Sequence, residues 1–158
     1  MASYRAMTHQ AGVPTQIQDA NDIVVGSGIK TNTGDLVLTA SSGKVGVGIS
    51  APKSTLDVNG AIAGKVTSVS ADYAAASEFV ILVTTGATGR TITLPAAANV
   101  PGRMYLIKKV DSGAGTVTID ANAAELIDGA TTVVMTLINQ AKVIISDGAA
   151  WNIFSSIV

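Results

Sequence analysis

Apolar and polar positions alternate in short stretches from residue 67 to the end of the sequence. A period of two places successive side chains on opposite faces of a strand. Turn residues separate these stretches at the spacing typical of a sandwich or barrel. The pattern therefore predicts an all-β fold, with a C-terminal antiparallel β-sandwich or barrel of seven strands. We expect them at residues 78–84, 91–94, 103–110, 116–120, 131–137, 142–146 and 151–155.

Turn chemistry supports this division of the chain. Asp128-Gly129 and Asp147-Gly148 are typical turn pairs, and glycine-rich connections occupy residues 86–89 and 111–115. Asn59-Gly60 is the strongest hairpin signal, because both central residues of a type I′ turn need a positive φ. It predicts flanking strands at residues 55–58 and 61–66.

The period of two also assigns faces to the C-terminal strands. The predicted inward set is Phe79, Ile81, Val83, Ile92, Leu94, Tyr105, Ile107, Val117, Ile119, Val133, Met135, Leu137, Val143, Ile145, Trp151 and Ile153. Further apolar residues fall on the opposite faces, namely Val80, Leu82, Val134, Ile138, Ile144 and Phe154. Apolar surface beyond the needs of one core usually marks an interface.

Short β-branched pieces punctuated by glycine fill residues 23–66. Such strands are too short to enclose a core within one copy, and a lone hairpin is marginal in water. They could pack against the C-terminal domain, or the same segments from several chains could wrap together. We favour an intertwined trimeric β-stem, because glycine permits close backbone approach at an axis. Its predicted trimer interface is Ile23, Val25, Leu36, Leu38, Val45, Val47, Leu56 and Ile62.

Residues 1–22 contain the single histidine and show no sustained period. This segment is interpreted as an N-terminal arm. The predicted domains are therefore an arm at 1–22, a stem at 23–66 and a β-sandwich knob at 67–158.

Composition narrows the classes of function. The 158 residues are 47% apolar and 13% charged, with a formal net charge of −1 and no cysteine. Hydrophobicity of this level with little charge excludes a disordered chain. The missing cysteines exclude disulfides and thiolate metal sites, and the scattered basic residues argue against nucleic acid as a partner. The basic doublet Lys108-Lys109 is interpreted as a solvated strand end.

Membrane insertion is not expected despite a mean hydropathy of +0.44. A spanning helix needs about 20 consecutive apolar residues, and the longest strongly apolar run is residues 79–83. The N-terminal sequence also lacks the apolar core of a secretory signal.

Candidate catalytic residues are few. His9 lies in the arm, away from any strand-rich scaffold that could orient it as a general base. Asp128 and Asp147 are explained by their turns, and a glycosidase would need a carboxylate pair with aromatic sugar platforms. We therefore expect no enzyme activity, no cofactor and no metal site.

Two segments resemble the structural proteins of bacteriophage virion appendages. GKVGVGISAPKSTLDVNGAIAGK is similar to a "VGIGT…P…LDVNG" segment of phage tail fibres, with Gly46, Gly48, Pro52 and 56–60 in place. The stretch from Thr91 to Phe154 resembles the small β-domain of the same proteins. The resemblance implies homotrimers in which three chains run parallel.

This resemblance and the patterns above lead to one functional hypothesis. Fibres of this family are often much longer, so a homotrimeric head decoration (cement) protein on the outside of a phage capsid fits better. The arm would contact the major capsid protein where capsomers meet, through Tyr4, Arg5, Met7, His9 and Val13. The alternative is a short tail or head fibre that binds a host surface protein or glycan through loops 86–89 and 111–115.

Overall fold

The computed structural model describes residues 44–157, and the structural statements below refer to them. The chain divides into two compact units, Met1–Asp57 and Val58–Val158. Strands β1 to β11 and one short 3-10 helix, η1 (Ala97–Asn99), are the regular elements of the described residues. The all-β prediction is confirmed.

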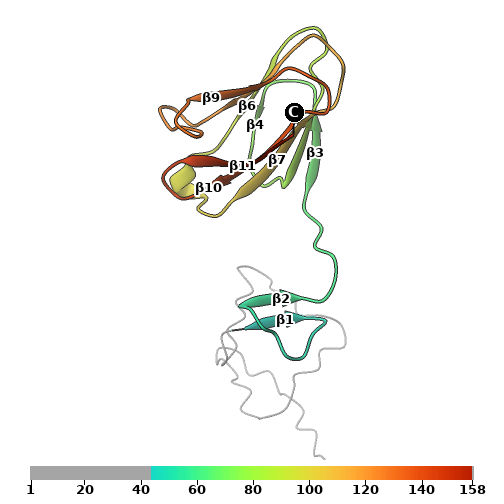
Figure 1. Cartoon of the computed structure of the whole chain (residues 1–158), viewed down its shortest axis with the longest axis vertical. Coiled ribbons are helices and arrows are strands. Elements are labelled where there is room, and N and C mark those ends of the chain that lie inside the picture. Colours follow the sequence, from blue (N-terminus) through green and yellow to red (C-terminus); the bar gives the residue numbers. More distant parts are fainter. Residues whose placement is uncertain (1–43, 158) are drawn as a thin grey trace, which may run out of the picture. The chain divides into compact units, whose positions relative to one another are not determined.

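Three sheets contain these strands. A two-stranded sheet pairs β1 (Val45–Val47) with β2 (Leu56–Val58). The other two sheets form the knob and face each other across its core (Figure 1). The five-stranded sheet has the order β11 (Trp151–Ile157), β10 (Ala141–Ser146), β7 (Met104–Lys109), β5 (Val80–Val83) and β3 (Val66–Val69). The four-stranded sheet has the order β4 (Tyr73–Ala74), β6 (Arg90–Thr93), β8 (Val117–Asp120) and β9 (Thr132–Met135).

The chain alternates between the two sheets of the knob from β3 to β8. Each strand is followed by one in the opposite sheet, and the chain then returns to pair beside the strand it left. Returning after such a crossover makes neighbours parallel, as observed for β3–β5, β5–β7, β4–β6 and β6–β8. We call β3 to β8 the strand coil. The pairs β8–β9, β7–β10 and β10–β11 are antiparallel.

The prediction of a purely antiparallel knob is therefore wrong, although all seven predicted C-terminal strands are present. The period of two identifies a strand, but it does not show which strand pairs with it or whether the two run parallel or antiparallel. A glycine-rich connection serves equally well for a hairpin or for a crossing to the other sheet. The sequence interpretation also missed β4 and did not assign β3 to the knob.

One hairpin prediction fails and two turn predictions hold. The strand before Asn59-Gly60 pairs with β1, and no strand forms at residues 61–65. The residues that follow join the knob instead. There the carbonyl of Lys65 accepts hydrogen bonds from the amides of Phe79 and Val80. At Asp128-Gly129 both φ angles are positive, and Ile127 and Ala130 exchange backbone hydrogen bonds, as a type I′ turn requires. Asp147 Oδ1 accepts from the amides of Ala149 and Ala150 and closes the second turn.

The core lies between the two sheets of the knob. Its largest fully buried apolar side chains include Trp151 and Tyr105, whose ring centroids are 5.7 Å apart. Most of the predicted inward set is buried or packs against the core. The correctly placed buried members are Ile81, Val83, Ile92, Leu94, Tyr105, Ile107, Val117, Ile119, Met135 and Trp151.

Three details of the predicted core are wrong. In β10 the inward residue is Ile144, because it lies opposite buried Tyr105, while Val143 and Ile145 lie opposite Leu106 and Met104. Phe79 and Leu137 fall outside the paired strands and are 45% and 61% exposed. Because residues 143–145 of β10 are all apolar, the sequence does not show which of them face inward. The pairing of β10 with β7 decides this.

Candidate functional site

The predicted arm and residues 23–43 of the predicted stem lie outside the described residues. This holds for Tyr4, Arg5, Met7, His9, Val13, Ile23, Val25, Leu36 and Leu38. The other four residues of the predicted trimer interface are described. Val45 is half-buried in β1, whereas Val47, Leu56 and Ile62 are 51%, 59% and 78% exposed in the single chain. Their role in a trimer interface stays a prediction.

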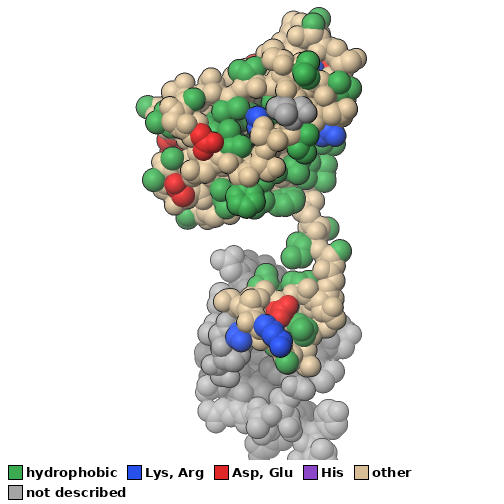
Figure 2. All heavy atoms as spheres, viewed as in Figure 1, with side chains coloured by type: hydrophobic (Ala, Val, Ile, Leu, Met, Phe, Trp, Pro, Cys, Tyr) green, Lys and Arg blue, Asp and Glu red, His purple; other side chains and the backbone are tan. Residues whose placement is uncertain are grey.

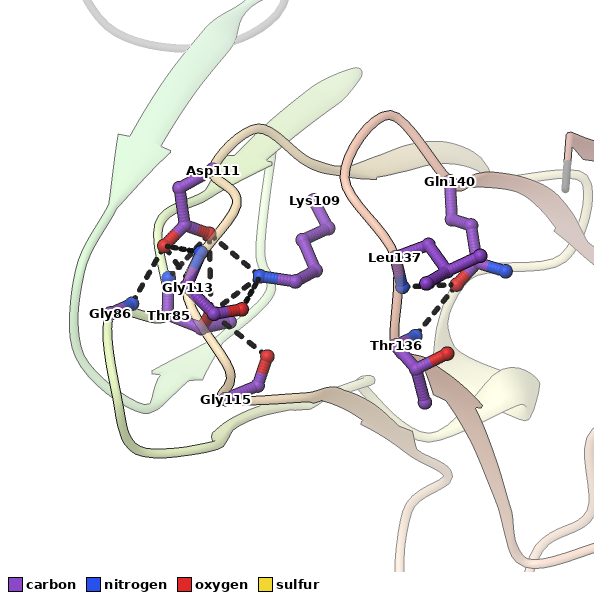
Figure 3. A network of polar contacts seen from close by, with 9 residues as sticks. All are labelled: Thr85, Gly86, Lys109, Asp111, Gly113, Gly115, Thr136, Leu137 and Gln140. Atoms are coloured by element: carbon purple, nitrogen blue, oxygen red, sulfur yellow. Dashed lines mark hydrogen bonds and ion pairs between the residues drawn. The ribbon is translucent and has the colours of Figure 1, made fainter.

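A fully buried lysine ends β7 and joins two loops of the knob (Figure 3). The Lys109 ammonium donates to Thr85 Oγ1 at 2.6 Å, to Asp111 Oδ1 at 2.8 Å and to the Gly113 carbonyl at 3.0 Å. A lysine ammonium has three N–H donors, so these contacts use all of them. The interpretation of Lys109 as a solvated strand end is therefore wrong.

Asp111 receives further hydrogen bonds from the neighbouring loop. The amides of Thr85 and Gly86 donate to its carboxylate at 3.0 Å and 2.8 Å, and the Thr85 hydroxyl lies 3.1 Å from Oδ1. The hydrogen bond from Lys109, together with those from this loop, holds the pKa of Asp111 well below its ordinary value. The loop after β5 is thus joined to the loop after β7 by hydrogen bonds from Thr85 and Gly86 to Asp111 and from Lys109 to Thr85.

Two glycines allow the loops to approach this closely. A Cβ on Gly113 would lie 2.0 Å from the Gly86 carbonyl oxygen, and one on Gly115 would lie 2.1 Å from that of Thr88. The amide of Gly115 donates to the Gly86 carbonyl at 3.0 Å. The glycine-rich connection at residues 111–115 therefore allows the two loops to pack closely.

A second buried charge lies where the chain enters the knob. Glu78 is 1% exposed, and its carboxylate accepts from Lys65 Nζ at 2.6 Å, the Tyr73 hydroxyl at 3.0 Å and the Ala76 amide at 2.7 Å. Burial by itself raises the pKa of Glu78, but the hydrogen bonds from Lys65 and Ala76 outweigh it and lower the pKa to about 2. The same contact raises the pKa of Lys65.

Both clusters hold their charges in fixed internal bonds. A general base or nucleophile needs a free electron pair within reach of a substrate, and Lys109 directs every donor inward. Glu78 is sequestered in the same way by its three donors. These groups are suited to hold segments of the knob together.

Sequence reasoning could have found Lys109 but not Glu78. The inward phase of β7 runs through Tyr105 and Ile107 and reaches Lys109 at the next step. A buried lysine requires an anionic partner, and Asp111 follows two positions later. Glu78 stands at the start of a predicted strand, and its partners Lys65 and Tyr73 come from segments whose place in the knob the sequence did not indicate.

The outer faces of the two sheets differ in chemistry. On the five-stranded sheet, register aligns Val66, Val80, Leu106 and Val143 in one row across β3, β5, β7 and β10. We call these four residues the aliphatic row. Leu82, Met104 and Ile145 lie on the same face, and hydrophobic side chains gather over these strands in Figure 2.

The outer face of the four-stranded sheet is mainly hydroxylated. Its two rows are Thr91, Thr118 and Val134, and Thr93, Asp120 and Thr132. Threonine fits a strand and keeps its hydroxyl in water. One outer face is therefore suited to solvent and the other to a partner.

The described residues also include a surface hollow and an unpaired buried polar atom. Residues 122–126 and 149–150 line a shallow surface hollow. Its carboxylate, Glu125, already accepts from the Ala97 amide that begins η1. Trp151 Nε1 is the buried side-chain polar atom without a partner in the part of the chain that the structure describes.

No protein-family model and no curated protein matches the sequence. Within residues 44–157, no group of three or more His, Cys, Asp or Glu side chains is arranged to hold a metal ion. No helix in the same range is long enough and apolar enough to cross a membrane.

Proposed function

We propose that the chain is a homotrimeric structural protein of a phage virion that decorates the capsid. Residues 1–22 bind the major capsid protein, residues 23–66 hold three copies together, and the knob faces outward. The observation that carries this proposal is a rigid all-β knob whose buried charges are all used internally and whose five-stranded sheet has an apolar outer face.

In this proposal the trimer attaches to the capsid through the sum of the contacts made by its three arms. Three arms on one trimer raise the effective concentration of each arm at the capsid, so individually weak contacts sum to stable attachment. Sites where three capsomers meet match this symmetry. The resemblance of the segment around β1 and β2 to phage fibre proteins supports parallel association of the three chains.

Deletion of residues 1–22 tests the proposal. The full chain is expected to cosediment with undecorated capsids of the same phage, and the deletion variant is expected to lose this binding. Each should have a native mass three times that of its own chain, which is 15.9 kDa for the full chain and less for the deletion variant. A monodisperse monomer, or full capsid binding by the deletion variant, would contradict the proposal.

A receptor-binding fibre remains the second candidate because the loops after β5 and β7 are held rigid by Lys109 and Asp111. Preorganised loops lose little conformational entropy on binding. Binding of the full chain to host cells, without binding to capsids, would favour this candidate.

A further inference from the structure

The margin of the five-stranded sheet at β11 presents the most exposed aromatic side chain of the described residues. The register with β10 passes from Val143 opposite Ser155 to Ile144 opposite Ile153, so Phe154 is the extra residue of a bulge. Phe154 is 78% exposed and Ile157, on the same strand, is 59% exposed. We call these two residues the β11 knob pair.

The opposite margin of the same sheet, at β3, presents an aliphatic side chain and no aromatic one. Val66 on β3 is 58% exposed and begins the aliphatic row. Three strands lie between β3 and β11, so the two margins are about 19 Å apart at about 4.8 Å per strand. The β11 knob pair therefore lies too far from Val66 to cover this end of the aliphatic row within one chain.

We propose that the β11 knob pair of one copy packs on the aliphatic row of a neighbouring copy, and that three such contacts close a ring around the trimer axis. The contact is heterologous, because each copy uses two different surfaces, and head-to-tail contacts of this kind form closed rings when the rotation closes. The number of copies rests on the trimer of the proposed function.

The area of the outer face of the five-stranded sheet favours a second copy of this chain as the partner that covers it. Five strands at about 4.8 Å spacing and four residues at about 3.3 Å rise cover about 300 Å², whereas a stable interface buries about 800 Å² on each partner. A contact this small does not recruit a separate protein from solution. It does form between copies that another segment already holds close together, because tethering raises their effective concentration.

Charge agrees with this choice. Among the outward positions of β7, Lys108 is the charged one. The aliphatic row contains no carboxylate that could pair with this lysine. The β11 knob pair and the aliphatic row are both uncharged, so their contact itself contains no charged side chain.

Cysteine cross-linking tests the contact in the full chain, which contains no native cysteine. Ser68 on β3 and Ser155 on β11 are exposed and project from the outer face, since they pair with Leu82 and Val143. A chain with both Ser68→Cys and Ser155→Cys is expected to form covalent trimers with a short bismaleimide. Each single variant is expected to stay monomeric on a denaturing gel, because its cysteines lie on different contacts.

Matched variants on the four-stranded sheet provide the control. The pair Thr91→Cys with Thr132→Cys faces outward from β6 and β9 and is expected to give no covalent trimer. Adding Phe154→Ser to the Ser68/Ser155 double variant should slow cross-linking about tenfold, because it removes the aromatic side chain that the proposed contact buries. Adding Val134→Ser, at a residue 50% exposed on the other sheet, should leave the rate unchanged.

The outcomes separate this contact from the proposed function. Dimers from Ser155→Cys alone would show a two-fold contact, and an unlinked double variant that still has a trimeric native mass would overturn the ring. Capsid binding without cross-linking would overturn the contact alone. Covalent trimers that fail to bind capsids would overturn capsid decoration and leave the contact standing.

Discussion

At the residue scale, two adjacent lysines of β7 have opposite environments. Lys108 is half-buried on the outer face of its sheet, while Lys109 is fully buried and donates to three oxygens of two loops. Alternation along the strand causes the difference, since neighbouring side chains point to opposite faces. A pair that looks uniform in sequence thus contains one solvated charge and one structural charge.

Lys109→Met should lower the free energy of unfolding by about 3 kcal/mol, because it leaves Asp111 with an unpaired charge in a partly desolvated loop. Lys108→Met is the matched control and should change it by less than about 0.5 kcal/mol. Urea unfolding followed by the fluorescence of the single tryptophan, Trp151, measures both. Equal effects from the two lysines would show that the network does not stabilise the knob.

Residue-level prediction succeeded where polarity and spacing determine position. Ile81, Ile92 and Ile119 are buried as the period of two indicates. It failed for Lys109 and Glu78, because a charged side chain is expected outside unless its partner is known. For Lys109 the anionic partner, Asp111, lies only two positions away and the inward phase of β7 was the overlooked signal. The partners of Glu78 come from other segments of the chain, and a single sequence does not show which segments meet.

At the element scale, strands were predictable and their neighbours were not. All seven predicted C-terminal strands are present, because alternation and turn residues are local signals. The parallel pairing of β5 with β7 depends on β6 joining the opposite sheet, which is a property of the whole knob. For the same reason Asn59-Gly60 did not form its hairpin, since the chain after it pairs with β5.

The connections between strands are constrained by their glycines. Gly115→Ala should destabilise the knob by about 1 to 3 kcal/mol, because the added methyl group would overlap the backbone of Thr88 and force the loop to move. Gly60→Ala is the control, since a Cβ there meets nothing within 4 Å, and it should have an effect within about 0.5 kcal/mol. Thermal unfolding of both variants compares them. A Gly115→Ala protein as stable as the control would contradict the tight loop packing.

At the scale of the whole molecule, two hydrogen-bonded carboxylates, Glu78 and Asp111, give the knob a defined response to acid. The pKa of Glu78 is about 2 in the folded chain, against an ordinary value of 4.5. Between these values the unfolded chain binds the proton more tightly, so stability falls as the pH is lowered from about 4.5 towards about 2. Asp111, with a pKa also below its ordinary value, adds to the loss in the same direction.

This acid response is measurable through one substitution. Glu78→Gln should be less stable than the native chain at neutral pH, by about 1 to 3 kcal/mol, because a neutral amide replaces the buried carboxylate that accepts from Lys65, Tyr73 and Ala76. Its stability should then fall less steeply between pH 4.5 and pH 2, since Gln does not titrate. Urea midpoints measured across this pH range for both chains give the two slopes. Parallel curves would show that Glu78 does not carry the acid sensitivity.

The strand coil also gives this molecule a simple way to change length during evolution. Each turn from one sheet to the other and back lies on the previous turn through the same parallel pairing. Duplication of one turn would lengthen the knob while β9 to β11 still closed its far side. Relatives built on this plan are therefore expected to differ by whole pairs of strands, with the closing strands kept.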